Sequence, residues 1–129
     1  MGAVDLDMPV LIVDDYQTML RTLGNLMRKL GFANIDEASD GHQALEKLHS
    51  RAYGLVISDW NMQPMSGLEL VRQMRSDARL DQVLVVMISA EDGEAAIAAA
   101  KQAGVSEYIV KPFCAATLKN KLAPILGRF

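Results

Sequence analysis

The sequence predicts an α/β fold in which a five-stranded parallel sheet is doubly wound, with helices on both faces. Short runs rich in β-branched residues and leucine alternate with segments whose apolar residues recur every three or four positions. This alternation is typical of repeated βα units, and five such units fit within the 129 residues. No linker, repeat or low-complexity tail separates a second unit, so we expect residues 1–129 to form one domain.

The first three strands are predicted at residues 10–13, near Ile35 and at 55–58. A helix with an apolar stripe follows the first strand and ends near Gly31. The residues of this stripe are Met19, Leu20, Leu23, Leu26, Met27 and Leu30. The turn Asp40-Gly41 precedes the second helix, which places its apolar residues on one side. These residues are Ala44, Leu45 and Leu48.

In the second half of the chain, Ser66 and Glu69 have the spacing of a capping box and predict the start of the third helix. A fourth strand is expected at 84–88, followed by an alanine-rich helix from about 93 to 103 that ends at Gly104. A fifth strand at 108–110 and a last helix complete the prediction. The apolar positions of that last helix are Leu118, Leu122 and Ile125.

Composition excludes several classes of protein. The net charge is −3 with a pI near 5.3, and no basic stripe is present, so direct binding to nucleic acid is not expected. The first seven residues are acidic where a secretory signal would be basic, and no apolar stretch could span a membrane. We therefore expect a cytoplasmic protein without a membrane anchor. The single cysteine, Cys114, fits a reducing compartment, and we interpret it as a small, partly buried apolar residue without chemistry.

Charged and polar side chains stand at the carboxyl ends of the predicted strands. Asp14 and Asp15 follow the first strand, and Asp59, Ser89 and Lys111 follow the third, fourth and fifth. In doubly wound sheets, ligands bind outside this edge. Unrelated solvated loop charges are the alternative, but five residues at matching ends favour a common site.

Three carboxylates at one edge repel one another unless a hard cation that prefers oxygen ligands lies among them, and Mg²⁺ is the natural candidate. Such a site suits phosphoryl transfer. Asp59 would be the nucleophile, Lys111 would supply a positive charge and Ser89 a neutral donor to the transferred oxygens. These three are the candidate catalytic residues.

The sequence resembles the receiver domains of bacterial two-component response regulators, most closely the stand-alone receivers of chemotaxis. The resemblance covers nearly the whole chain. The matching segments are Leu11-Ile12-Val13-Asp14-Asp15, Asp59-Trp60-Asn61-Met62, Met87-Ile88-Ser89-Ala90-Glu91 and Tyr108-Ile109-Val110-Lys111-Pro112-Phe113. It implies a flavodoxin-like sheet with strand order 2-1-3-4-5, and a single response regulatory domain with no effector domain.

By the same resemblance, a histidine kinase phosphorylates Asp59, and Lys111 and Ser89 bind the phosphoryl group. Mg²⁺ is then held by the side chains of Asp14, Asp15 and Asp59 and by the main-chain carbonyl of Asn61. The Lys111-Pro112 peptide is cis in similar proteins, which directs the lysine into the site. The expected protein is a phosphoacceptor that catalyses only its own phosphorylation and dephosphorylation, and is otherwise not an enzyme.

The resemblance also implies a switch and an output surface. Ser89 moves toward the phosphoryl group, and the ring of Tyr108 turns inward. The output face would consist of the alanine-rich helix around 94–101, the Tyr108 strand and the last helix. We expect the protein to be a monomer that binds the flagellar motor switch protein. Without the neighbouring motif, we would interpret Tyr108 as an ordinary half-buried aromatic. The alanines of the helix around 94–101 do not by themselves indicate a partner, because alanine is the best helix former.

The main alternative is a stand-alone receiver that regulates a kinase or carries phosphate in a phosphorelay. A phosphatase with an aspartate nucleophile is disfavoured, because Asn61 cannot act as the second acid. A flavin protein is disfavoured too, since no Ser/Thr-rich phosphate loop is present.

One departure concerns the loop after the nucleophile. The family usually has proline directly after the methionine that is Met62 here, whereas this chain has Gln63 there and Pro64 next. We expect partner choice, rather than the chemistry, to be affected. Asn61 and Glu91 occupy the two variable positions that tune loss of the phosphoryl group, and they predict a short-lived aspartyl phosphate.

Overall fold

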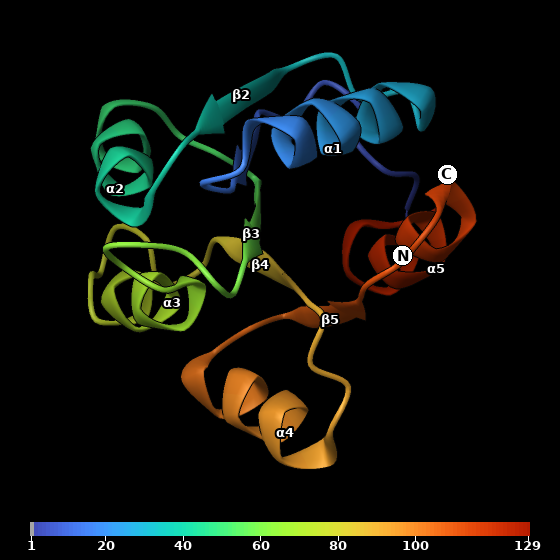
Figure 1. The fold of residues 1–129 in the computed structure, drawn as a ribbon. Helices are drawn as coiled ribbons and strands as arrows, with labels where there is room; N and C mark the ends of the chain where they lie inside the picture. The colour runs from blue at the N-terminus through green and yellow to red at the C-terminus, as the bar shows by residue number, and fades with distance from the viewer. Residues whose placement is uncertain (1) are drawn as a thin grey trace.

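The computed structural model describes residues 2–129, in which five parallel strands alternate with five helices (Figure 1). The strands are β1 (Val10–Val13), β2 (Ile35–Ala38), β3 (Leu55–Asp59), β4 (Leu84–Ser89) and β5 (Glu107–Val110). The helices are α1 (Gln17–Lys29), α2 (Gly41–Ser50), α3 (Gly67–Arg75), α4 (Glu94–Ala103) and α5 (Ala115–Leu126). The order in the sheet is β2-β1-β3-β4-β5, and every pair is parallel. The doubly wound fold and the strand order implied by the resemblance are confirmed.

Helices cover both faces of the sheet. In Figure 1, α1 and α5 lie on one side and α2, α3 and α4 on the other. Successive residues of β1 point to opposite faces, so Val10 and Ile12 belong to the core under α1 and α5, while Leu11 and Val13 belong to the other core. All four are fully buried, which explains why the strand is a continuous apolar run rather than an alternating one.

Local sequence signals account for several helix ends. The Ser66 hydroxyl accepts a hydrogen bond from the Glu69 N–H (3.1 Å) and caps α3, which confirms that part of the predicted capping box. Asp40 caps α2 in the same way, through the Gln43 N–H (2.8 Å). At the end of α4, Gly104 has a φ of 111°, a left-handed conformation that favours glycine.

The interpretation of Cys114 as a partly buried residue is wrong, because the structure leaves this residue exposed. Cys114 is the N-cap residue of α5, a position outside the helix that does not pack against the sheet. Its Sγ lies 3.4 Å from the Thr117 hydroxyl, and this contact is the largest cause that lowers the pKa of the thiol.

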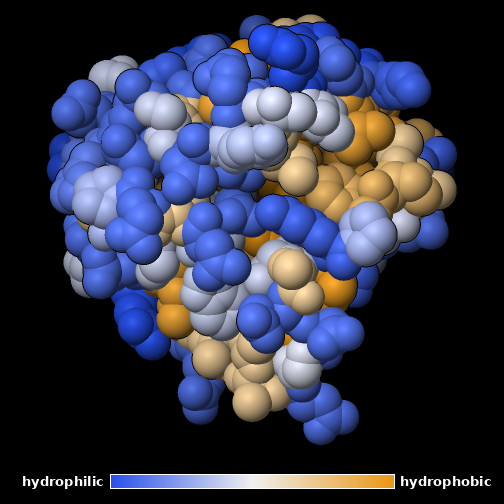
Figure 2. Space-filling view, in the orientation of Figure 1, coloured by the Kyte–Doolittle hydropathy of each residue, from blue (hydrophilic) through white to orange (hydrophobic). Residues whose placement is uncertain are grey.

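Apolar atoms reach the surface in two areas of the face shown in Figure 2, one over α4 and one between α1 and α5. The second area contains a groove of about 320 Å³ between α1 and the residues that follow β5. It is lined by Met19, Thr22, Leu26, Lys111, Pro112 and Phe113. None of the helices within residues 2–129 has the length and hydrophobicity needed to cross a membrane.

Candidate functional site

Strand register brings the predicted site residues to one edge of the sheet. Val13 of β1 pairs with Ser58 of β3, so Asp14 and Asp59 follow at the same level. On the other side of β3, Asp59 pairs with Ile88, the residue before Ser89. Ser89 in turn pairs with Val110, the residue before Lys111. Residues that lie far apart in the sequence are therefore neighbours at the carboxyl ends of the strands.

Asp59 and Lys111 form an ion pair at this edge. The distance from Lys111 Nζ to Asp59 Oδ1 is 2.7 Å, and the Asp59 side chain is only 7% exposed whereas that of Lys111 is 28% exposed. The Lys111-Pro112 peptide is cis, as the resemblance implied. The geometry of the pair is not that of a hydrogen bond, so Asp59 Oδ1 accepts none from residues 2–129.

Asp14 is a buried carboxylate beside this pair, with 2% of its surface exposed. Its Oδ1 accepts a hydrogen bond from the Tyr16 N–H (3.0 Å), but its Oδ2 has no partner among the described residues. Burial raises the pKa of Asp14 from 3.8 to about 6, and the neighbouring Asp59 adds to this effect. The Tyr16 N–H and Lys111 act in the opposite direction, but burial outweighs them. Burial is thus the main cause of the raised pKa of Asp14, and the charge of Asp59 is a smaller one.

Asp15 differs from Asp14 because its side chain is exposed. Its Oδ2 accepts a hydrogen bond from the backbone N–H of Gln63 (3.3 Å), in the loop that follows β3. The Gln63-Pro64 peptide in that loop is cis. Asn61, whose main-chain carbonyl was predicted as a metal ligand, is an exposed residue of the same loop. The hydrogen bond to Asp15 could not be predicted from residue types, because its donor is a main-chain group.

The donor set fits a magnesium ion. Asp14 Oδ2 and Asp59 Oδ1 are buried carboxylate oxygens that accept no hydrogen bond within residues 2–129. Asp59 Oδ1 already faces the Lys111 ammonium group, whereas a cation would satisfy Asp14 Oδ2. In the described part of the chain, no group of three His, Cys, Asp or Glu side chains is placed so that it could hold a metal ion, so the structure does not gather Asp14, Asp15 and Asp59 as one ligand set. Mg²⁺ is usually bound by one or two carboxylates and keeps several waters.

The two predicted switch residues meet at the backbone of Glu91. Ser89, which is 1% exposed, accepts a hydrogen bond from the Glu91 N–H at its hydroxyl oxygen (3.0 Å). The Tyr108 hydroxyl donates a hydrogen bond to the Glu91 carbonyl (2.8 Å). Tyr108 is 3% exposed, so its ring points inward. The ring also makes an edge contact with Trp60, with centroids 6.2 Å apart. Tyr108 is thus more buried than the half-buried aromatic considered as the alternative.

The carboxyl edge of this 2-1-3-4-5 sheet carries buried aspartates, a lysine and an inward tyrosine. This arrangement is typical of phosphoacceptor signalling domains. The family model for the response regulator receiver domain matches residues 10–123. The chain therefore belongs to the response regulator receiver family, and it is a signalling protein rather than a conventional enzyme.

The relatives that match nearly the whole chain include chemotaxis proteins. The chain is 48% identical to the chemotaxis protein CheY of Pseudomonas aeruginosa, over 94% of this chain and 98% of that protein. It is 49% identical to the chemotaxis protein CheY-3 of Vibrio cholerae, over 95% and 94% of the two chains. The solved structure of CheY4 of Vibrio cholerae superposes with a TM-score of 0.86 at 28% identity, over 93% of this chain and 99% of that one. The chain is thus a CheY-like receiver domain, as the sequence predicted.

Proposed function

We propose that this protein is a single-domain response regulator that a histidine kinase phosphorylates on Asp59 in a magnesium-dependent reaction. The observation that carries the proposal is the buried Asp59 carboxylate, which faces Lys111 at 2.7 Å and lies beside the unpartnered Oδ2 of Asp14. An Asp59 oxygen would attack phosphorus and form a new O–P bond. The N–P bond to the donor histidine would break, and the imidazole would leave with that electron pair.

The residues around Asp59 have separate parts in this reaction. Mg²⁺ would be held by Asp14, Asp15, Asp59 and the Asn61 carbonyl. When bound, it would neutralise negative charge on the phosphoryl oxygens. The Lys111 ammonium group, which is paired with Asp59 here, would then pair with the phosphoryl oxygens, because the acyl phosphate oxygen of Asp59 no longer carries the carboxylate charge. Ser89 would donate its hydroxyl proton to another phosphoryl oxygen.

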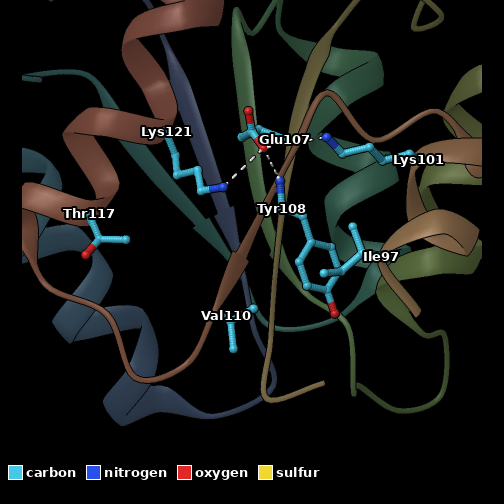
Figure 3. A pocket seen from close by; sticks show the side chains of 7 residues that line it. All are labelled: Ile97, Lys101, Glu107, Tyr108, Val110, Thr117 and Lys121. Carbon is cyan, nitrogen blue, oxygen red and sulfur yellow. Dashed lines mark hydrogen bonds and ion pairs between the residues drawn. The ribbon is translucent and has the colours of Figure 1, made fainter. Parts of the chain in front are cut away.

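The same step would act on the output face. Movement of Ser89 toward the phosphoryl group breaks its hydrogen bond with the Glu91 N–H, and the Glu91 carbonyl is held by Tyr108. Tyr108 lines a surface pocket of about 250 Å³ between α4, β5 and α5 (Figure 3). There Lys101 and Lys121 approach Glu107 Oε1 from opposite sides, at 3.8 and 3.7 Å. A protein partner that contacts this face would therefore sense the state of the switch.

For the partner, we infer the flagellar motor switch protein in chemotaxis, because relatives at nearly half identity are chemotaxis proteins. The alternative is a receiver that regulates a kinase or carries phosphate in a relay. Both functions use the same phosphoacceptor chemistry, so only the partner distinguishes them.

The test measures binding of the purified protein to a flagellar switch-protein peptide, with Mg²⁺ and beryllofluoride as the phosphoryl mimic, or without them. Asp59→Asn is the control. Binding that requires the mimic and is lost in the variant supports the motor assignment. If Asp59 is modified but the peptide is not bound in either state, the kinase-regulating or relay function replaces it. If Asp59 does not react with a phosphodonor at all, the phosphoacceptor proposal is wrong.

A further inference from the structure

The Gln63 N–H donates a hydrogen bond to Asp15 Oδ2 from the loop that follows β3. The resemblance implies proline at the position of Gln63, and proline carries no backbone N–H. Here the glutamine supplies the N–H, which lies 3.3 Å from one oxygen of an exposed carboxylate. The exchange of Gln63 and Pro64 relative to that pattern therefore places an additional donor at a residue of the proposed metal site.

The loop that carries this N–H is anchored on both sides. Met62 and Met65 flank Gln63-Pro64 and are 3% and 2% exposed, so both side chains insert into the core. Met65 lies against Gly41, where a Cβ would come within 2.5 Å of its sulfur. The Gly67 N–H also donates to the Trp60 carbonyl (2.8 Å) and closes the loop at its base. These contacts fix the backbone of Gln63, although the residue itself is exposed.

We propose that the backbone N–H of Gln63 is a positioning group that orients the Asp15 carboxylate for Mg²⁺ and raises the affinity of the site. The inference rests on the proposed function, because it assumes that Asp15 is a ligand. A carboxylate has about four lone-pair directions, so Oδ2 can accept this N–H while the group still binds a cation. An exposed aspartate would otherwise sample several rotamers, and the hydrogen bond reduces the conformational freedom lost on binding.

The expected effect is moderate. A hydrogen bond of this kind contributes about 0.5–1.5 kcal/mol net, which corresponds to about a two- to thirteenfold change in the dissociation constant of Mg²⁺. The long distance and the exposure of Asp15 favour the lower half of this range.

The experiment compares two variants of the whole protein by ¹⁵N NMR during a magnesium titration. Gln63→Pro combined with Pro64→Gln exchanges the two residues and removes the N–H of position 63. Gln63→Ala removes only the side chain and keeps the N–H, so it is the matched control. The amide shifts of Asp14, Asp15 and Trp60 report binding without any need for phosphorylation.

The inference predicts that the exchanged variant binds Mg²⁺ about two- to fivefold more weakly, while Gln63→Ala binds as the wild type does. Equal or tighter binding in the exchanged variant overturns it. If the wild-type amides near Asp14, Asp15 and Asp59 do not shift with Mg²⁺, the metal site of the proposed function has failed instead.

A second measurement tests the hydrogen bond independently, in case the exchanged variant disturbs the loop. In the wild-type background, Asp15→Ala should move the Gln63 amide proton upfield and accelerate its exchange with solvent. An unchanged Gln63 amide in Asp15→Ala shows that the hydrogen bond is absent, and it overturns the inference even if the exchanged variant folds poorly.

Discussion

Replacing Asp14 by asparagine should stabilise the protein at neutral pH when no magnesium is present. Asp14 is 2% exposed, and burial raises its pKa from 3.8 to about 6. Above that pH the native state holds an ionised carboxylate in surroundings that favour the neutral acid, with Oδ2 lacking a hydrogen-bond donor within residues 2–129. Asparagine removes the charge but keeps a side-chain oxygen that can accept the Tyr16 N–H.

The size of the effect follows from proton linkage. A folded-state pKa above the unfolded value means that the native protein binds more protons, so stability falls as the pH rises from about 4 to about 6. The full penalty is present above this range. A pKa difference of this size corresponds to roughly 3 kcal/mol. Because asparagine is itself a polar side chain that is costly to bury, we expect a gain of about 2 kcal/mol, or about 8 °C in Tm for a chain of this length.

Urea and thermal unfolding at pH 7.5 and pH 4, with a chelator present, would measure this gain. The difference between the variant and the wild type should largely close at pH 4, where the wild-type carboxylate is mostly protonated. Added Mg²⁺ should also narrow it by stabilising the wild type. Asp92→Asn is the matched control, since it removes the same charge from an exposed residue. An Asp14→Asn variant that is no more stable than the wild type at pH 7.5 would refute the reasoning.

Other substitutions test other parts of the structure. Asp36→Asn should destabilise the protein more at pH 7 than at pH 3 in urea unfolding. A hydrogen bond from Tyr53 (2.5 Å) lowers the pKa of Asp36, and the stabilisation present above the unfolded pKa is lost as the pH falls through the folded pKa. Gly67→Ala should cost about 3 kcal/mol in the same assay, because its Cβ would lie 2.1 Å from the Asp59 carbonyl oxygen; wild-type stability would contradict this contact. Lys111→Ala should lower stability by about 2 kcal/mol and slow the reaction of Asp59 with acetyl phosphate, followed by mass spectrometry, whereas an unchanged rate would exclude a role in phosphoryl transfer. Tyr108→Ala and Tyr108→Trp should change the affinity of the phosphorylated protein for its partner, and an unchanged affinity in both would exclude the switch role.

The sheet and the side chains at its edge were predictable because their signals lie in residue types. Continuous apolar runs mark buried parallel strands, and topology then places the residues after them at one edge. Other parts of the site had no such signal. The partners of Asp15 and Ser89 are backbone N–H groups of Gln63 and Glu91, and every residue except proline has such a group. The positions of these N–H groups depend on how each loop is anchored. The Gln63 loop is anchored by buried methionines, which cannot be told apart from other core residues in the sequence.

These main-chain contacts explain how a small change at Asp59 could reach a distant surface. In the proposed mechanism, the Glu91 peptide accepts the Tyr108 hydroxyl at its carbonyl and donates to Ser89 at its N–H. If Ser89 turns toward a phosphoryl group, the N–H of Glu91 loses its acceptor, and the exposed loop that carries it is no longer held to Ser89. Tyr108 restrains the same loop from β5, so the new position of Glu91 depends on both hydroxyls. Substituting Tyr108 should therefore alter the coupling between Asp59 and the α4-β5-α5 face, while the Mg²⁺ affinity of the carboxylates at the other side of β3 stays close to that of the wild type.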